Sequence, residues 1–449
     1  MNRPIPDPAS PAAVLEIGER VAEAPSRCLT DIAFRSELRA QLGLSSAINW
    51  VDLAHTLTLA EQGIIPRDSA RTLIAALLVL HEAPASFAPA ADYGDLYTNR
   101  EAWLAQSTEA AGWLGVARAR REALTTAYHL ILCDALLDMG AKVADAAEML
   151  KVASLRYKNA FIPDYTYLQV AQPTTFGHYL QSFAWPMLRD LDRVRTLYDR
   201  ADRLAEDLMI FASAEFAFIK LADRHARASK IMPQKRNPFA LAFVRATANR
   251  LIGVQAGIAA ASRTPSAQMD NRLFAYEAVP DAVRSAGEAA SLVAECVEGL
   301  HIDEARARDA LGDRSVCASD LAERVMAASR IDYRTARGVV GRLITALEEC
   351  GLTLAQVTAT DVGKALREVG ASPEGVADEL VAAALDLGTC ISARTDVGGA
   401  APAELTAMAS ALDDALNSHR QGFDTLRARR EASLRRLDEE ARTFAGEAE

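Results

Sequence analysis

The sequence predicts an all-α protein, and its composition and its apolar periodicity are the observations behind that prediction. Hydrophobic residues make up 50% of the 449-residue chain, whereas aromatic residues make up only 6%. Alanine and leucine, which favour helices over strands, dominate the hydrophobic fraction. A chain of this length can also bury a large core and divide into two or three helical layers.

The clearest helical pattern lies in residues 178–208. Apolar side chains recur there every three or four residues, at positions 180, 184, 187, 191, 194, 198 and 201. A helix of about thirty residues would span roughly 45 Å, which suits a long bundle better than a compact small domain. Pro186 lies inside the pattern, which continues past it, so we expect a kink there and not a helix end.

The N-terminal part begins with a Pro- and Ala-rich stretch of about 25 residues, which we expect to be a loose arm. A helical pattern follows through INWVDLAHTLTLAEQGII, stops at Gly63 and restarts after Pro66. The loop EAPASFAPAADYG, residues 82–94, then separates an N-terminal region from the rest.

Residues 109–139 predict a long amphipathic helix, and three arginines lie near its start. They are Arg118, Arg120 and Arg121. Cations are poorly placed against the positive end of a helix dipole, so these side chains predict a nearby anion. An exposed basic helix start is the alternative interpretation.

Charge and cysteine usage exclude several classes of protein. The net charge is −11 and the pI about 5.3. Because nucleic-acid binding needs a basic face, this acidic charge argues against a nucleic-acid-binding protein. Six scattered cysteines without a C-x-x-C pair indicate free thiols in a reducing compartment. No signal-peptide pattern appears at the start, and no apolar run reaches the ~20 residues of a membrane span. We therefore expect a cytoplasmic protein without nucleic-acid or membrane partners and, since no nucleotide loop or metal motif appears, without a cofactor.

One stretch reverses the acidic balance. RHARASKIMPQKRNP, residues 224–238, holds five Arg or Lys residues and His225. Such a local reversal of charge favours a small anion as ligand. Ser229 has the side chain of a nucleophile or base, and Lys235 and Asn237 are donors suited to developing negative charge.

The order of these residues resembles the signature loop of the fumarase/aspartase superfamily: Ser, Met-Pro two residues later, then x-Lys-x-Asn-Pro. The Gln-Lys pair after Met-Pro is most similar to argininosuccinate lyases. YTYLQVAQPTTFGHYL resembles the segment Tyr-Thr-His-Leu-Gln-x-Ala-Gln-Pro-x-Thr-Phe-Gly-His of that family. DLAH with LAEQGII, SDLAERVMAASR and RTDVGGAAPAEL resemble further blocks, so the resemblance covers about residues 31–420 in the right order.

The resemblance implies a fumarase/aspartase-type fold, all-α, with a central long-helix bundle flanked by smaller N- and C-terminal helical domains. We accordingly expect an N-terminal domain at 1–94, a central bundle domain at 95–335 and a C-terminal domain at 336–449. It also implies a homotetramer whose composite active sites combine segments of three subunits. Long apolar-striped helices, which cannot all hide their stripes in a monomer, favour an oligomer as well.

The resemblance further implies an elimination that forms fumarate from a dicarboxylate-containing substrate. A proton leaves the carbon next to a carboxylate, and a group leaves the neighbouring carbon. Ser229 matches the family's base, and Lys235 is a catalytic residue that supports the ionised hydroxyl and the developing carbanion. The residues expected at the substrate are Arg118, Arg120, Arg121, Thr166, Asn237, Gln268 and Arg272.

The sequence differs from the argininosuccinate lyase pattern at two positions that would protonate the leaving group. Tyr167 stands where the family usually has a histidine, and Ala242 stands where that histidine's glutamate partner is expected. Tyr167 is either an acid through its O–H or a side chain that fills the space. Loss of the histidine argues against argininosuccinate itself as substrate.

A third departure concerns the group of residues that holds argininosuccinate in the family. The family's tyrosine, glutamine and lysine are replaced by Gln268, Leu273 and Tyr276, and Arg272 is the nearest cation. His55 matches a family histidine, for which we expect a structural hydrogen bond.

These observations predict a carbon–nitrogen lyase that releases fumarate from an N-substituted aspartate other than argininosuccinate, with Ser229 as base. Two alternatives stay open. One is a cycloisomerase or a nitrosuccinate-type elimination on the same scaffold. The other is a catalytically degenerate paralogue with a structural role, as lens δ-crystallins arose from this family.

Overall fold

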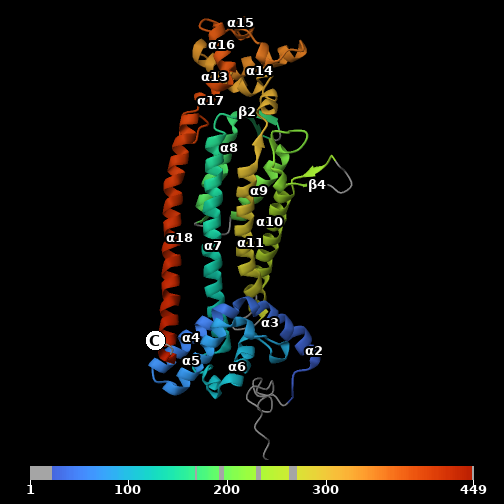
Figure 1. Ribbon diagram of the computed structural model, residues 1–449. Helices are drawn as coiled ribbons and strands as arrows, with labels where there is room; N and C mark the ends of the chain where they lie inside the picture. Colours follow the sequence, from blue (N-terminus) through green and yellow to red (C-terminus); the bar gives the residue numbers. More distant parts are fainter. Residues whose placement is uncertain (1–22, 167–168, 192–196, 229–233, 262–269, 447–449) are drawn as a thin grey trace, which may run out of the picture. The chain divides into compact units, whose positions relative to one another are not determined.

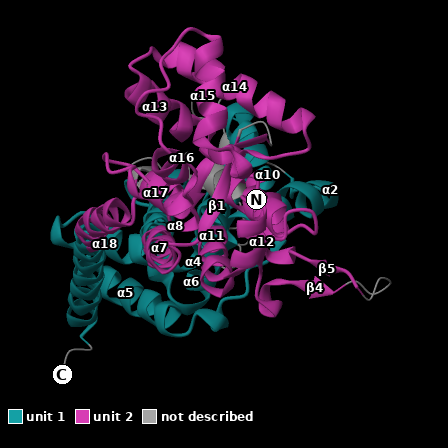
Figure 2. Cartoon of the chain, turned by 90° about the horizontal axis from the view of Figure 1, so that it is seen from above, with its two compact units in different colours: residues 1–141, 249–287, 421–449 teal, residues 142–248, 288–420 magenta. Residues whose placement is uncertain are grey.

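The structure, a computed structural model, describes residues 23–166, 169–191, 197–228, 234–261 and 270–446. The chain forms two compact units, each built from discontinuous segments (Figure 2). Unit 1 comprises residues 1–141, 249–287 and 421–449, and unit 2 comprises residues 142–248 and 288–420.

Four long helices, labelled in Figure 1, contribute segments to both units defined above. They are α7 (Arg120–Arg156), α10 (Phe239–Ala261), α11 (Asp270–Gly299) and α18 (Pro402–Ala445). In unit 1, Arg430 of α18 forms an ion pair with Asp134 of α7. In unit 2, the buried ammonium of Lys151 in α7 bonds Asp413 of α18 and lies 2.7 Å from Glu148. Each unit therefore contains part of a long-helix bundle.

The N-terminal elements of unit 1 pack around an apolar core that includes Ile48, Leu53, Leu73 and Leu77. Its further helices are α2 (Arg27–Leu29), α3 (Arg35–Gln41), α4 (Ser45–Glu61), α5 (Arg67–Glu82) and α6 (Leu96–Ser107). Shorter turns are η1 (Thr30–Phe34), η2 (Leu42–Leu44), η3 (Pro84–Ser86), η4 (Ala91–Tyr93) and η5 (Glu109–Trp113).

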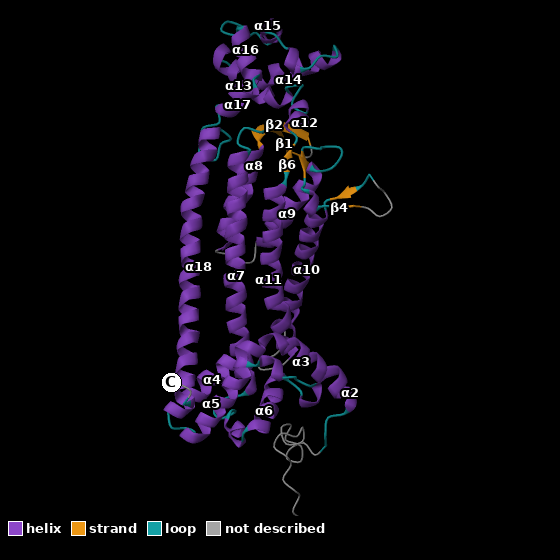
Figure 3. Cartoon of the chain, in the orientation of Figure 1, coloured by secondary structure: helices purple, strands orange, loops and turns teal. Residues whose placement is uncertain are grey.

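Unit 2 adds three short two-stranded antiparallel sheets to its helices (Figure 3). They pair β1 (Phe161–Thr166) with β2 (Gln169–Thr175), β3 (Ile219–Lys220) with β6 (His301–Ile302), and β4 (Arg227–Ala228) with β5 (Arg236–Asn237). The helices α8 (Phe176–Leu191) and α9 (Leu197–Phe211) and the turn η6 (Asp223–His225) lie between the strands in sequence.

The C-terminal helices of unit 2 enclose a second apolar core, which includes Leu321, Val325, Val339 and Leu366. These elements are α12 (Glu304–Asp309), η7 (Ser315–Cys317), α13 (Ala318–Ser329), α14 (Tyr333–Glu349), η8 (Leu354–Gln356), α15 (Ala359–Glu368), α16 (Asp378–Leu385) and α17 (Leu387–Ser392).

The predicted all-α class is confirmed, since strands are confined to the three small sheets of the described residues. Gly63 ends the first predicted helix with φ at +65°, and α5 begins directly after Pro66. Pro186 lies inside α8, which continues past it as expected. Residues 192–196, which would join α8 to α9, lie outside the described residues, so the single long helix stays a prediction. The division at residues 94 and 335 also stays a prediction.

Among the described helices, none combines the length and the apolarity that crossing a membrane would take.

Candidate functional site

A buried carboxylate lies at the centre of the predicted arginine segment. Asp52 of α4 is fully buried, and its Oδ2 accepts hydrogen bonds from Nε and Nη2 of Arg100 at 3.0 and 2.7 Å. Arg100 Nη2 also donates to Asn49 Oδ1 at 2.9 Å. The other oxygen, Oδ1, accepts from Arg118 Nη2 at 2.7 Å. All of these groups are buried, so each charge needs its oppositely charged partner to compensate for the loss of contact with water.

Arg118 precedes α7 and is held in place by this carboxylate. Only 6% of its side chain is exposed, and its guanidinium carbon lies 5.5 Å from the centre of the Tyr97 ring. Its Nε and Nη1 make no well-formed hydrogen bond within the described part of the chain. Ala117 before it has a positive φ of 56°, an unusual backbone conformation for a side-chain-bearing residue.

Arg120 differs from Arg118 in exposure. It is the first residue of α7, and its Nη1 lies 3.0 Å from Oδ2 of the buried Asp95. About half of its side chain, 52%, is exposed to solvent. The anion that the sequence predicted near the helix start is therefore a pair of protein carboxylates, Asp52 and Asp95. Arg121 follows on α7 and is exposed.

Two further acidic groups of unit 1 face the same arginines. Burial, together with the nearby carboxylates of Asp95 and Asp52, raises the pKa of Glu101 to about 7. Burial and Asp95 also raise the pKa of Glu37 above its ordinary value. Tyr97 stays protonated, because burial raises its pKa to about 12.

His55 takes the structural role expected of it. Its Nε2 lies 2.9 Å from the carbonyl oxygen of Val116, so Nε2 carries the proton and donates. Burial, with Arg118 nearby, lowers the pKa of His55. The ring therefore ties α4 to the segment that leads into Arg118.

Unit 2 carries the described part of the signature loop, residues 234–238. Asn237 of β5 donates from Nδ2 to the carbonyl oxygen of Arg227 at 3.2 Å, which closes the β4–β5 pair. Arg236 anchors this pair through Nε to Asp223 Oδ1 at 2.9 Å. Lys235 lies next to it and is exposed. His225, at the base of this pair, is buried with Nε2 3.5 Å from Glu295 Oε2.

Thr166 is the last residue of β1, where its backbone pairs with Gln169 of β2. Three predicted residues, Tyr167, Ser229 and Gln268, lie outside the described residues. Arg272 lies in α11. Their roles stay predictions.

Tyr276, one of the three substituted family positions, is part of the core of unit 1. Its side chain is buried, its hydroxyl lies 2.9 Å from Thr125 Oγ1, and its ring centre lies 5.2 Å from that of Tyr128. It therefore packs between helices α11 and α7.

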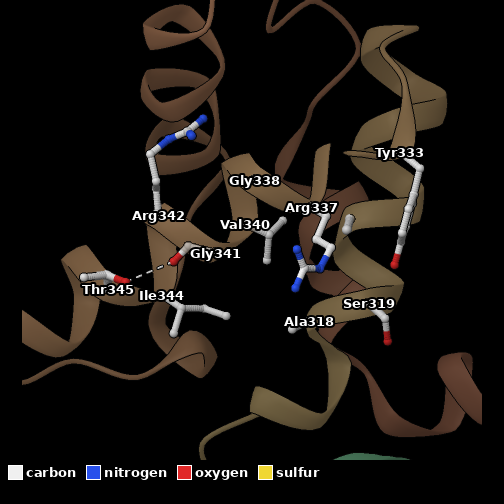
Figure 4. Close-up of a pocket in the computed structure, with 11 residues that line it drawn as sticks. Ala318, Ser319, Tyr333, Arg337, Gly338, Val340, Gly341, Arg342, Ile344 and Thr345 are labelled. Carbon is white, nitrogen blue, oxygen red and sulfur yellow. Dashed lines mark hydrogen bonds between the residues drawn. The ribbon is translucent and has the colours of Figure 1, made fainter. Parts of the chain in front are cut away.

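Two cavities of unit 2 have none of the predicted site residues among the described residues that line them. One, of about 470 Å³, is lined by α13 and α14, and Arg337 extends between these helices (Figure 4). Gly338 and Gly341 are among the residues that line it. The other, of about 570 Å³, lies beside β2 and α8. There His178 Nε2 donates to the Gly398 carbonyl oxygen at 2.9 Å and fixes the loop before α18.

Comparison with known proteins identifies the family. A family model described as "Lyase" matches residues 96–203 and 200–253. The argininosuccinate lyase of Methanothrix thermoacetophila is 27% identical over 486 residues, covering 94% of this chain and 97% of that protein. The argininosuccinate lyase of Chelativorans sp. is 26% identical over 457 residues, covering 86% and 93%. The chain is an argininosuccinate lyase-like member of the fumarase/aspartase superfamily.

The fold of this lyase agrees with the assignment. A crystal structure of an EDDS lyase in complex with formate superposes with a TM-score of 0.80 at 20% identity and covers 95% of this chain and 97% of that one. Its similarity to argininosuccinate lyases assigns the chain to the carbon–nitrogen lyases.

Sequence reasoning missed several groups around the arginines of this lyase: Asp52, Asp95, Tyr97, Arg100 and Glu101. The sequence contains one signal that could have identified Asp52. Asp52 lies on the same face of α4 as buried Ile48 and Thr56, and a charge at a core-facing position requires a buried partner. The partner itself, Arg100, is 48 residues away and has no local pattern that marks it.

Proposed function

We propose that the lyase releases fumarate from an N-substituted aspartate by cleaving the bond between carbon and nitrogen. The observation that carries this proposal is the near full-length similarity to argininosuccinate lyases, together with the intact Ser-x-x-Met-Pro-x-Lys-x-Asn-Pro signature. Because the similarity spans 94% of this chain, it includes the segments on both sides of the signature.

The elimination removes a proton from the carbon next to one carboxylate and breaks the carbon–nitrogen bond on the neighbouring carbon. The electron pair of the broken C–H bond forms the double bond of fumarate, and the electron pair of the C–N bond leaves with the amine. Ser229 is proposed as the base. Lys235, exposed at β5, and Asn237 are proposed to stabilise the carbanion, whose charge spreads onto the carboxylate.

Arg120 is proposed as the arginine that holds a substrate carboxylate. It combines 52% exposure with a fixed position on Asp95, whereas Arg118 is 6% exposed and already bonded to Asp52. A guanidinium suits a planar carboxylate because it can donate two parallel hydrogen bonds. Arg121, Thr166, Gln268 and Arg272 remain proposed substrate contacts.

The leaving amine is proposed to differ from that of argininosuccinate. Tyr167 and Ala242 replace the family's histidine and glutamate, and Ala242 lies exposed on α10. A tyrosine O–H, with an ordinary pKa of about 10, is a weaker acid than imidazolium. A leaving group that needs less protonation therefore fits better. A cycloisomerase and a non-catalytic role are not favoured, since the similarity is to fumarate-forming lyases and the signature is intact.

A homotetramer with composite active sites is proposed as the working assembly. Helix α10 presents Phe239 and Phe243, four residues apart on one face, to solvent in the single chain, with exposures of 47% and 53%. An exposed apolar face of this kind is typical of helices that pack against another copy. A cytoplasmic location is proposed from the cysteines, all six of which are free.

The experiment that tests this function runs the reaction toward synthesis. Purified protein is incubated with fumarate and a panel of amines, diamines, amino acids, guanidines, hydrazines and nitrite, and products are read by mass spectrometry. The proposal expects one adduct with the mass of fumarate plus the amine. Nitrite as the only reacting partner would instead support the nitrosuccinate-type elimination. Silence across the panel from a folded, assembled protein would contradict the proposed function.

A further inference from the structure

The cavity between α13 and α14 of unit 2 has a positively charged lining, although the chain as a whole is acidic. Two arginines, Arg337 and Arg342, are among the described residues that line it, and these include no aspartate or glutamate. The chain carries a net charge of −11. A hollow lined by charge of one sign attracts small ions of the opposite sign. The cavity is therefore suited to an anion.

Arg337 is the charge that a ligand in this cavity would meet. Figure 4 shows its side chain extending between the two helices, whereas Arg342 points away from that space. Arg337 makes no hydrogen bond or ion pair with the part of the chain that the structure describes. Arg394, by contrast, is paired with Asp320 of α13 at 3.2 Å. A guanidinium without a partner can donate two parallel hydrogen bonds to a carboxylate.

Two hydroxyl groups lie on one side of this guanidinium (Figure 4). Ser319 of α13 and Tyr333 of α14 both line the cavity, and neither hydroxyl has a hydrogen-bond partner among the described residues. The hydroxyl of Thr345 differs, because it donates to the Gly341 carbonyl oxygen at 3.2 Å. Each free hydroxyl can donate one hydrogen bond to an anion and so orient it.

The rest of the lining is largely apolar. Ala322 and Val340 are buried side chains, with exposures of 2% and 3%, and the half-buried Ile344 lies beside them. The volume of about 470 Å³ lies within the range of sites for small organic molecules, roughly 300–1,000 Å³. An apolar wall gives a strongly hydrated inorganic anion no donors for its remaining oxygens. The lining therefore favours an anion that carries an apolar body.

Two glycines in the middle of α14 keep this space open. Gly338 and Gly341 both line the cavity, and a methyl group built on Gly341 would have no neighbour within 4 Å. Alanine would fit there and is the better helix former. Glycine at this position therefore lowers helix stability and leaves room in the cavity.

We propose that this cavity is a second ligand site of the lyase, which takes a small monocarboxylate with an apolar body. Arg337 binds the carboxylate, the hydroxyls of Ser319 and Tyr333 orient it, and the apolar lining holds the body. None of the residues predicted for the elimination is among the described residues that line the cavity. The inference is therefore independent of the proposed function.

The test compares 3-phenylpropionate with its uncharged analogue 3-phenylpropanol on the full chain by ligand-observed NMR titration. A ligand of this size should bind 3-phenylpropionate with a dissociation constant of about 1 mM and the alcohol about tenfold more weakly. Arg337→Gln should weaken binding of the acid about tenfold, to the level of the alcohol. Arg342→Gln removes the same charge from an arginine that points away and should leave binding unchanged. Gly341→Leu should abolish binding of both compounds by filling the space.

A second measurement needs no variant. Phenylglyoxal modifies accessible arginines, and peptide mass spectrometry locates the modified residues. At about 10 mM, roughly ten times the expected dissociation constant, 3-phenylpropionate should slow modification of Arg337 about tenfold. Arg334, which is exposed on the same helix and lies outside the lining, should react at an unchanged rate.

Three results would overturn the inference. They are equal binding of acid and alcohol, unchanged binding of the acid to Arg337→Gln, and equal protection of Arg334 and Arg337. Protection of Arg337 by inorganic phosphate but not by 3-phenylpropionate would also overturn it, because the site would then take a hydrated anion. None of these results bears on the elimination, which the synthesis panel tests separately.

Discussion

Arg118 lies 2.7 Å from Asp52, and both side chains are buried. The first arginine of the predicted substrate segment is thus bound to a carboxylate of the protein itself. This pair links helix α4 to the start of α7 and leaves the more exposed Arg120 as the arginine proposed to contact the substrate.

Removal of the shared carboxylate should destabilise the chain strongly. Asp52→Ala leaves the buried guanidiniums of Arg100 and Arg118 without a counter-charge, and breaking a buried ion pair typically costs about 3–5 kcal/mol. The matched control is Asp31→Ala, which breaks an exposed pair with Arg35 of the same 2.7 Å length. That change should cost less than about 1 kcal/mol. Denaturant unfolding compares the two, and equal losses would contradict the structural role of Asp52.

The two arginines should respond differently to the same substitution. Arg120→Lys keeps the charge but loses the parallel donors, so we expect KM to rise about tenfold with an unchanged thermal midpoint. Arg118→Lys should lower the thermal midpoint, because a lysine cannot reproduce its buried contact with Asp52. Steady-state kinetics and thermal unfolding of both variants separate the roles. A reversed pattern would assign the substrate to Arg118.

Close helix packing in unit 2 should depend on Gly177. A methyl group on this residue of α8 would lie 2.3 Å from the backbone oxygen of Ser154 in α7. Gly177→Ala should therefore cost about 1–3 kcal/mol through overpacking. Gly341→Ala in α14 has open space around it and should stabilise the helix by up to about 1 kcal/mol. Thermal midpoints that move in the same direction would contradict this assignment.

Folding stability should fall as pH rises through the titration of Glu101. Its pKa is raised from 4.5 to about 7, so the folded protein binds this proton more tightly than the unfolded chain. The stabilising contribution is complete below about pH 4.5 and is lost as pH rises to about 7. Thermal midpoints measured across this window should show a shallower decline for Glu101→Gln than for the unmutated protein. Parallel curves would show that Glu101 titrates normally.

The sequence could predict the helical class, the breaks at Gly63 and Pro66 and the structural hydrogen bond of His55, because each depends on local pattern or on a matched motif. It could also predict an anion near the helix start. It could not predict that the anion is Asp52, since that residue and Arg118 lie 66 positions apart. The raised pKa of Glu101 likewise depends on burial and on carboxylates from separate elements.

Ser229 is proposed to start the elimination that forms fumarate. The most direct measurement follows fumarate release by absorbance from the N-substituted aspartate that the synthesis panel identifies. Ser229→Ala should lower kcat by about 10³-fold, in the range expected for loss of a general base, with the assembly unchanged. Ser433→Ala, which removes an exposed hydroxyl on α18, should release fumarate at the unmutated rate. Equal rates for all three proteins would contradict the proposed role of Ser229.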